Sequence, residues 1–247
     1  MLKHYFKVAF RNLIKNKARS IISILGLVAG IFCFTTTNYY GRAFYRGDEV
    51  FPEYNRMARI YLKYEGNLAL LAPTKDAPAQ KEDIEQVLEF DLPEVEYAAT
   101  FSETSYYNIE MTADGHRNHL YTVAAMNVNA DFMHVYPSRF LEGSVEQFTS
   151  RPLMALVTRS FVNQLGINEQ PVGKTFTTVS RRDEELEHPA IYTIAGVIED
   201  YPAFTSFTLF GRNIDMLLLN DGGNQCTFLL NKYIDLENLN NRIIGLQ

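Results

Sequence analysis

An uncharged stretch of 22 residues between Arg19 and Arg42 constrains this chain more than any other feature of its sequence. Residues 21–34 are almost entirely apolar, and a helix of 22 residues is about 33 Å long at 1.5 Å per residue. The hydrocarbon core of a bilayer is about 30 Å thick, so this length is enough to cross it. The threonines at 35–37 are tolerated because their hydroxyls bond to carbonyls one turn back. We therefore predict a transmembrane helix over residues 20–45.

Six cations and no acid precede this stretch, and they predict the orientation of the helix. They are Lys3, Lys7, Arg11, Lys15, Lys17 and Arg19. Cytoplasmic ends of membrane helices carry such an excess, so the N-terminus is predicted to be cytoplasmic and the chain beyond residue 45 to lie outside. The first four cations recur every four residues, away from the apolar positions, which is typical of a helix lying on a membrane surface. We expect residues 1–19 to form a basic interfacial helix that contacts membrane lipid.

Two further pairs of residues belong to the predicted membrane segment. Tyr39 and Tyr40 lie near its outer end, where aromatic side chains gather at the membrane interface. Gly26 and Gly30 form a G-x-x-x-G pair on one face of the helix. Because this spacing lets a second membrane helix approach closely, we expect the two glycines to mediate helix packing.

Other interpretations of the first 45 residues compete with the membrane anchor. A cleaved signal peptide would use residues 21–34 as its apolar region, but threonines follow it and no A-x-A-like cleavage site is found. An apolar or amphipathic helix packed on a soluble core would show similar periodicity. The length of the uncharged stretch and the cations at its beginning favour the anchor.

Residues 46–247 are predicted to form one domain of the α+β class. Strand and helix patterns occur in mixed order without a βαβ rhythm. The Asp114-Gly115 pair predicts a hairpin between two of the strands, and the strands on either side of the charged stretch 181–188 are expected to pair. The predicted strands are 57–64, 95–101, 106–112, 120–128, 153–158, 176–180, 191–198 and 226–231, and the predicted helices are 76–89, 130–136, 159–165 and a last one from 236.

The charge of this domain argues against nucleic acid as a partner. The whole chain has a formal net charge of −6. Without the six N-terminal cations the remaining residues carry 17 cations against 29 acids, a net charge of −12. Such a body offers no positive surface for phosphates.

No motif for catalysis, for a cofactor or for a metal is found. Residues 171–175 end like a phosphate-binding loop, but Asn168 stands where that motif needs glycine, so a turn before a strand is predicted instead. Asp114, His116 and His119 lie near the predicted hairpin turn without a further strong ligand, which disfavours a metal site. The two cysteines, Cys33 and Cys226, are not expected to form a disulfide. We expect no enzyme activity, no cofactor and no metal.

Several segments, in the same order along the chain, resemble the MacB/FtsX-like permeases of ABC transporters. They cover nearly the whole sequence. Those near the N-terminus are FRNLIKNK at 10–17 with ILGLVAG at 24–30, and FPEYNR at 51–56 with RIY at 59–61. Those further along are VNADF at 128–132 with FLEG at 140–143, LVT at 156–158 with LG at 165–166 and PVGKTF at 171–176, and YTIAGVIEDYP at 192–202.

This resemblance implies a permease subunit in the inner membrane, with a periplasmic core domain that transmits conformational change from a partner ATPase. The implied partners are an ATP-binding subunit on the cytoplasmic side, a second permease copy or a paired permease, and membrane lipid. Family members carry a polar turn where this chain has Phe204-Thr205-Ser206-Phe207. They also have at least three more membrane helices, so we expect this chain to be a C-terminally incomplete fragment. The alternative is a stand-alone, membrane-anchored binding or assembly module.

Overall fold

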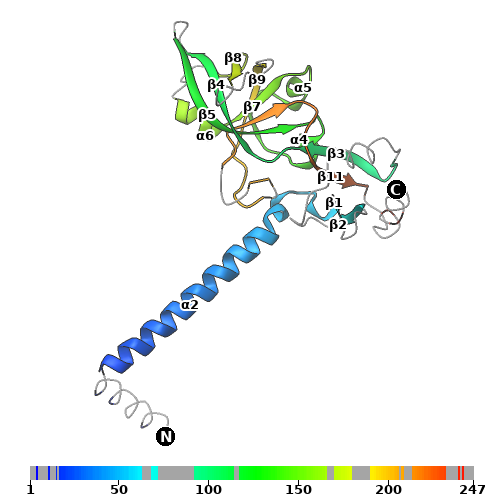
Figure 1. The fold of residues 1–247 in the computed structure, drawn as a ribbon. Coiled ribbons are helices and arrows are strands. Elements are labelled where there is room, and N and C mark those ends of the chain that lie inside the picture. The colour runs from blue at the N-terminus through cyan, green and yellow to red at the C-terminus, as the bar shows by residue number, and fades with distance from the viewer. Residues whose placement is uncertain are drawn as a thin grey trace. The chain divides into compact units, whose positions relative to one another are not determined.

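The computed structural model divides into two compact units, Met1–Tyr45 and Arg46–Gln247 (Figure 1). The structure describes residues 4, 11, 15, 17–62, 68–71, 92–113, 117–165, 170–179, 190–205, 207–208, 213–231, 239 and 241.

The first unit contains the long helix α2, Lys17–Tyr45. Within it, Ile21–Ala43 is long and apolar enough to cross a membrane, with a mean hydropathy of 1.8 and none of it buried. The hydroxyl of Thr35 donates to the carbonyl oxygens of Ile31 and Phe32 at 2.8 and 3.0 Å, so its hydrogen-bonding capacity is satisfied within the helix. The predicted apolar helix is therefore confirmed.

Six strands of the second unit pair into a closed ring, which we call the barrel. The pairing runs β5–β4–β8–β9–β7–β10 and returns from β10 to β5. The β7–β9 and β5–β10 pairs are parallel and the others antiparallel. The strands are β4 (Ser105–Ala113), β5 (Arg117–Val128), β7 (Met154–Thr158), β8 (Thr175–Val179), β9 (Ile191–Ile198) and β10 (Met216–Leu219).

A second group of strands, which we call the extension, continues the sheet away from the barrel (Figure 1). Its order is β3–β11–β1–β2, all antiparallel, and Phe101 of β3 pairs with Val128 of β5 at the junction. The strands are β1 (Met57–Leu62), β2 (Leu68–Leu71), β3 (Val95–Phe101) and β11 (Gln225–Leu230). The short strand β6 (Phe140–Glu142) pairs with β9.

Short helical segments complete the described part of the second unit. They are the 3-10 turns η1 (Gly47–Val50) and η2 (Tyr54–Arg56) and the helices α4 (Phe132–Val135), α5 (Val145–Phe148) and α6 (Arg159–Leu165). The side chain of Ser144 caps α5 by accepting a hydrogen bond from the backbone of Gln147. Such a cap satisfies a donor that a helix N-terminus leaves without a partner.

Two hydrophobic cores lie on opposite faces of shared strands. In β10, Met216 and Leu218 belong to the core of the barrel, whereas Leu217 and Leu219 belong to the core between the barrel and the extension. Successive side chains of a strand point to opposite faces, so one four-residue strand contributes to both cores. This explains why all four residues of β10 are buried.

The predicted α+β class is confirmed, and every predicted strand has a counterpart in the structure. The strands 95–101 and 191–198 and the helix 159–165 have the predicted bounds. The hairpin pairing of β4 with β5 and the pairing of β8 with β9 are also confirmed. The sequence did not predict β2, β6, β10, α5 or the parallel pairs. The helix expected over 76–89, the Asp114-Gly115 turn, His116 and the stretch 181–188 lie outside the described residues, as does most of the last helix.

Candidate functional site

Residues 47–56, which we call the entry segment, connect the two units in sequence. They begin two residues after Tyr45, the last residue of α2, and end where β1 begins. The segment consists of η1, the dipeptide Phe51-Pro52, Glu53 and η2. Three of its residues make specific contacts with the rest of the second unit, one through its backbone and two through their side chains, and these contacts define the candidate site.

The first contact is a close backbone approach at Gly47. A Cβ atom placed on Gly47 would overlap with the carbonyl oxygen of Phe204, so only glycine fits here without a shift of the neighbouring backbone. Phe204 itself has a φ of 67°, a left-handed conformation that is rare for a residue with a bulky side chain. It lies in loop 201–208, where the hydroxyls of Thr205 and Thr208 are 2.6 Å apart and both side chains are buried. Hydrogen bonds within the loop thus fix its shape, and its backbone packs against the entry segment at Gly47.

The second contact is Phe51, which is 5% exposed and inserts among buried rings. Its ring centroid lies 5.1 Å from that of Tyr136 and 6.1 Å from that of Phe207. We call this group the aromatic cluster; its members are Phe51, Phe101, Phe132, Tyr136, Tyr201 and Phe207. Edge-to-face and tilted ring pairs of this kind stabilise by about 0.5–1.5 kcal/mol each beyond the area that they bury.

The polar ends of the cluster are also satisfied. The hydroxyl of Tyr136 lies 2.8 Å from the hydroxyl of Thr227 in β11. The hydroxyl of Tyr201 donates to the carbonyl oxygen of Tyr136 at 2.9 Å, and burial raises the pKa of Tyr201 far above its usual range. These bonds fix the rings because an unpaired buried hydroxyl would cost free energy.

The third contact is Arg56, at the end of the entry segment. Its Nε donates to the carbonyl oxygen of Leu230 at 2.7 Å, its Nη1 lies 3.0 Å from the carboxylate of Glu53, and its Nη2 pairs with Glu96. The hydrogen bond with Glu53 raises the pKa of Arg56 further, against the opposing effect of desolvation. One guanidinium group thus joins the entry segment to β3 and to the end of β11.

A second arginine lies close by in a different environment. Arg59 in β1 is 6% exposed, and its guanidinium carbon lies 5.6 Å from the centre of the Phe101 ring. Its Nε lies 3.5 Å from the Thr227 hydroxyl, while its buried Nη2 has no hydrogen-bond partner among the residues that the structure describes. Because desolvating a charged group without full pairing is costly, we expect Arg59 to destabilise the core that it helps to fill.

The sequence-predicted membrane residues fall in the first unit. Arg11, Lys15 and Lys17 are exposed on helical backbone, and Arg19 lies in α2; Lys3 and Lys7 lie outside the described residues. Tyr39 and Tyr40 are exposed, with their rings 5.6 Å apart.

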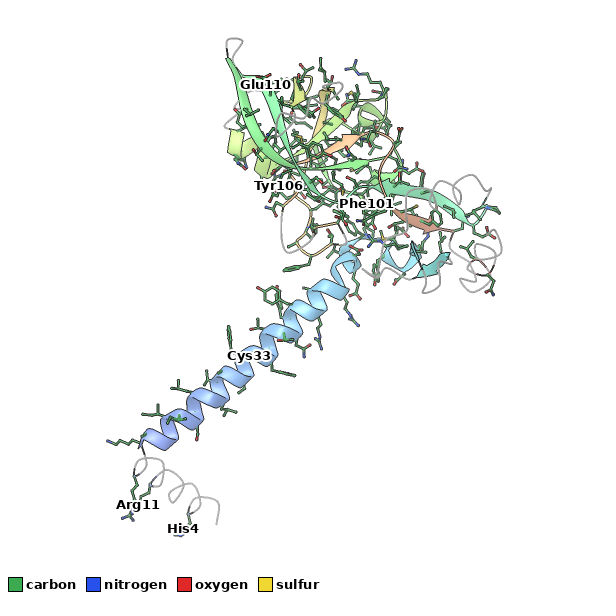
Figure 2. The ribbon with its side chains drawn as sticks, viewed as in Figure 1. His4, Arg11, Cys33, Phe101, Tyr106 and Glu110 are labelled. Carbon is green, nitrogen blue, oxygen red and sulfur yellow. The ribbon has the colours of Figure 1, made fainter. Side chains whose placement is uncertain are left out.

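The predicted packing glycines share their face of α2 with other small residues. A Cβ on Gly26 or Gly30 would meet no atom within 4 Å. At about 100° of rotation per residue, the two glycines and the small residues named next lie within an arc of about 80° around the helix axis. The further members of this face are Ser23, Cys33, Thr37 and Gly41; Cys33 is labelled on the helix in Figure 2.

The segments with a family resemblance have structural roles in the second unit. Asn129 accepts from the backbone N–H of Thr100 and donates to the carbonyl oxygen of Ala98, and Asp131 accepts from the N–H of Ala98, so VNADF fastens the end of β5 to β3. Gly173, with a φ of 89°, turns the chain into β8 as predicted for residues 171–175. Within the described part of the chain, no group of three or more His, Cys, Asp or Glu side chains is placed to hold a metal ion.

Sequence reasoning found part of this site and missed the rest. Phe51 and Arg56 lie in a segment that the sequence singled out, although without a role for either. Arg59 and Phe204 also lie in segments that the sequence singled out, without a role for either, whereas Gly47 was not identified. A charged residue in the strand pattern 57–64 was the available signal for Arg59, whereas the approach of Gly47 to Phe204 has no signature in the sequence.

Comparison with protein families gives a match between residues 20–246 and the model of the MacB-like periplasmic core domain. Comparison with curated proteins gives no significant match.

Among solved structures, a domain of a protein described as a permease from Porphyromonas gingivalis matches with a TM-score of 0.54 and 18% identity, over 80% of this chain and 85% of that one. This similarity concerns the fold. The periplasmic region of MacB from Actinobacillus actinomycetemcomitans matches at 0.44 and 11% identity (77% of this chain, 82% of that one). The extracellular domain of the transporter YknZ from Gram-positive bacteria matches at 0.44 and 12% identity (77% and 96%).

Proposed function

Because the chain belongs to the family of MacB-like periplasmic core domains, we propose that it works as the permease subunit of an ABC transporter and transmits ATP-driven conformational change. The observation that carries the proposal is that one family model spans both the apolar helix and the sheet-rich domain. A partner ATPase on the cytoplasmic side of the inner membrane hydrolyses ATP. The helix and the domain convert the resulting motion into export or release of a substrate.

The entry segment is the part of the chain through which such motion passes. Every force on the domain from α2 crosses the peptide bonds after Tyr45, and the next described contacts are those of Gly47, Phe51 and Arg56. A flexible connection would absorb the motion, whereas buried rings and charge-assisted hydrogen bonds resist it. The attachment reaches loop 201–208, β3 and β11, so the pull is distributed over the core rather than over one strand.

The membrane part contributes lipid and helix contacts in this proposal. The basic residues Lys3, Lys7, Arg11, Lys15, Lys17 and Arg19 hold the inner end at the lipid surface, and Tyr39 and Tyr40 hold the outer end. Gly26 and Gly30, with the other small residues on their face, accept another membrane helix, from a second copy or from a paired permease.

A flexible insertion tests the transmission. Gly-Ser-Gly is inserted between Arg46 and Gly47 of the complete permease, which is reconstituted with its ATPase in lipid nanodiscs. Spin labels on Ile24→Cys in α2 and Leu120→Cys in β5 report the distance between the two units with and without ATP. Cys33→Ser removes the exposed native thiol, while burial raises the pKa of Cys226 and keeps it unreactive.

We expect ATP to change this distance in the parent protein and to lose its effect in the insertion variant. The matched control carries the same insertion after Ala113, at the end of β4, and should respond to ATP as the parent does. A response that survives the insertion at Gly47 contradicts transmission through the entry segment. If no ATPase co-purifies with the complete protein and ATP changes nothing in the parent, the permease function itself is wrong and a stand-alone module is favoured.

A further inference from the structure

We infer that the junction between β3 and β5 is a hinge on which the extension moves against the barrel, and that the buried guanidinium group of Arg59 keeps this hinge close to opening. The inference concerns the second unit alone. It goes beyond the proposed transmission, because it assigns a moving part within the domain and a residue that sets how often this part moves.

The junction is the narrowest connection between paired strands of the two regions. Among the described residues, β3 and β5 share one residue pair, Phe101 with Val128. Every other pair of neighbouring strands within the barrel or within the extension shares three to nine. A connection of one residue pair can bend while the longer ladders on either side stay intact, as hinges between rigid parts do.

The chain crosses between the two regions at this junction. The connection from β3 to β4 crosses at 102–104, and the connection from β10 to β11 crosses at 220–224. Gly222 has a φ of 83°, and a Cβ atom on Gly223 would overlap with the backbone of Ser102. Glycine allows this close approach, and it also adopts other φ and ψ values without the steric penalty of a side chain. The second crossing is therefore able to follow a movement at the first.

The environment of Arg59 lowers the cost of opening. Its guanidinium carbon lies 5.6 Å from the centre of the ring of Phe101, the residue of β3 that forms the junction. Arg59 is buried, and its Nη2 has no hydrogen-bond partner among the described residues. Contact with the face of a ring offsets part of the cost of burying a charge, but it does not replace the missing hydrogen bond. A movement of the extension that lets water reach Nη2 removes this cost.

The core between the barrel and the extension opposes the movement. Phe101, Met126 and Leu217 are buried together in it, and separating them exposes apolar surface to water. The closed arrangement therefore dominates, and the open one is a minor state. The entry segment reaches this core through Phe51 and the strands β3 and β11 through Arg56. A pull on the entry segment thus acts on the extension side of the hinge.

Amide hydrogen exchange of the full chain in detergent micelles, resolved to single residues by NMR, tests the hinge. The reporters are the N–H groups of Ser102 and Asn129, which cross the junction to the carbonyl oxygens of Asn127 and Thr100 at 2.9 and 3.0 Å. The N–H groups of β11 and β4 are the internal reference, because a hinge motion leaves the ladders of both strands intact.

Two matched variants isolate the buried charge. Arg59→Met removes the guanidinium group beside the junction and keeps an apolar side chain of similar length. Arg139→Met makes the same change at an exposed position, where Nη1 of Arg139 lies 3.5 Å from Glu199. The control therefore loses an arginine of the same domain without changing a buried charge.

In the parent protein we expect Ser102 and Asn129 to exchange about tenfold or more faster than the N–H groups of β11. Arg59→Met should slow exchange at both junction residues by about tenfold or more, because each 1.4 kcal/mol added to the cost of opening is a factor of ten in the open population. Exchange in β4 should stay the same, and Arg139→Met should behave as the parent does.

Two results would overturn the inference. If Arg59→Met leaves exchange at Ser102 and Asn129 unchanged or makes it faster, the junction merely frays and Arg59 does not set the hinge. If β11 exchanges as fast as the junction in the parent, the extension unfolds as a whole and does not move as a body. Neither result bears on the proposed permease function, which the insertion before Gly47 tests.

Discussion

The barrel and the extension differ in how their outermost strands are paired. The barrel closes on itself, whereas the extension needs other segments to cover its edge. The barrel pairs each of its six strands on both sides, so it has no open edge along the ring. The extension ends at β2, which pairs only with β1 among the described strands. An open edge needs cover or partners, whereas a closed ring needs neither.

The cores of the two regions also differ in whether segments outside the strands are needed to fill them. The barrel is filled mainly by side chains of its own strands, such as Ile109, Val123 and Ile194, with α6 adding Phe161. The core beside the extension takes Phe51 from the entry segment and Tyr201 and Phe207 from loop 201–208. Phe101 of β3, labelled in Figure 2, lies in this second core. The entry segment and loop 201–208 therefore complete the core of the extension but not that of the barrel.

Removing the ring shared by most of the cluster should have the largest effect and should affect the extension first. Phe207 lies with its centroid 5.0–6.1 Å from the rings of five other members of the aromatic cluster. We expect Phe207→Ala to lower the free energy of unfolding by about 3–5 kcal/mol. Thermal unfolding of the full chain in detergent measures this, with exposed Ile191→Ala as the control at about 0.5 kcal/mol or less. Equal losses in the two variants would refute the central role of Phe207.

Two neighbouring leucines of β10 test directly whether the two cores unfold independently. Leu217→Ala removes a side chain from the extension core and Leu218→Ala one from the barrel core, and each should cost about 2–5 kcal/mol. Amide hydrogen exchange should rise in β3 and β11 for the first variant and in β4, β8 and β9 for the second. The same pattern of exchange in both variants would mean that the two cores unfold as one.

A substitution that is expected to stabilise the protein tests whether the buried charge in the extension lowers the free energy of unfolding. Arg59→Met keeps an apolar stem and removes the buried Nη2, which has no hydrogen-bond partner in the described part of the chain, so we expect a gain of about 1–4 kcal/mol in the free energy of unfolding. Arg56→Met removes a guanidinium with three acceptors and should lose about 1–3 kcal/mol. Urea unfolding of the two variants decides, and a loss for Arg59→Met would show that its charge is better compensated than its contacts indicate.

The smallest effect concerns pH and the barrel. Burial raises the pKa of Asp215 above its ordinary value of 3.8, although its carboxylate accepts a hydrogen bond from the N–H of Ala124 at 2.7 Å. The folded state therefore holds the proton more tightly than the unfolded state, so the destabilising effect of this group grows as pH rises above that value and is constant above the raised pKa of the folded state. Asp215→Asn keeps an oxygen acceptor and does not ionise. Its melting temperature relative to the parent should rise between acidic and neutral pH, and a flat difference would contradict the shift.

The sequence predicted elements with strong local patterns and missed those set by distant contacts. Strand β9 alternates in its first half and is rich in β-branched residues, so its bounds were predicted. Strand β10 is four apolar residues buried on both faces, and such a short run carries no periodicity that distinguishes a strand from other buried structure. Closure of the barrel depends on pairing residues 125–128 with 216–219, which no local pattern encodes.

The candidate site divides in the same way. Phe51 and Arg56 lie in a segment whose resemblance marked it as important. The contact of Gly47 with Phe204 depends on a left-handed backbone at a phenylalanine, a conformation that its surroundings impose and its residue type disfavours. Tyr106 and Glu110, labelled on β4 in Figure 2, are the opposite case, since simple alternation along the strand places them on the face away from the barrel core.

The shared strand β10 also sets the order of events during biogenesis. The ring cannot close until residues 216–219 are available to β5 and β7. In the proposed topology, the earlier barrel strands therefore reach the far side of the membrane with an unpaired edge. Pairing between segments about 90 residues apart in sequence carries a large loop-closure entropy and is slow to form. During that interval the exposed edges are prone to pair with other chains. Secretion of this domain should therefore depend on extracytoplasmic chaperones until the translocation machinery releases β10.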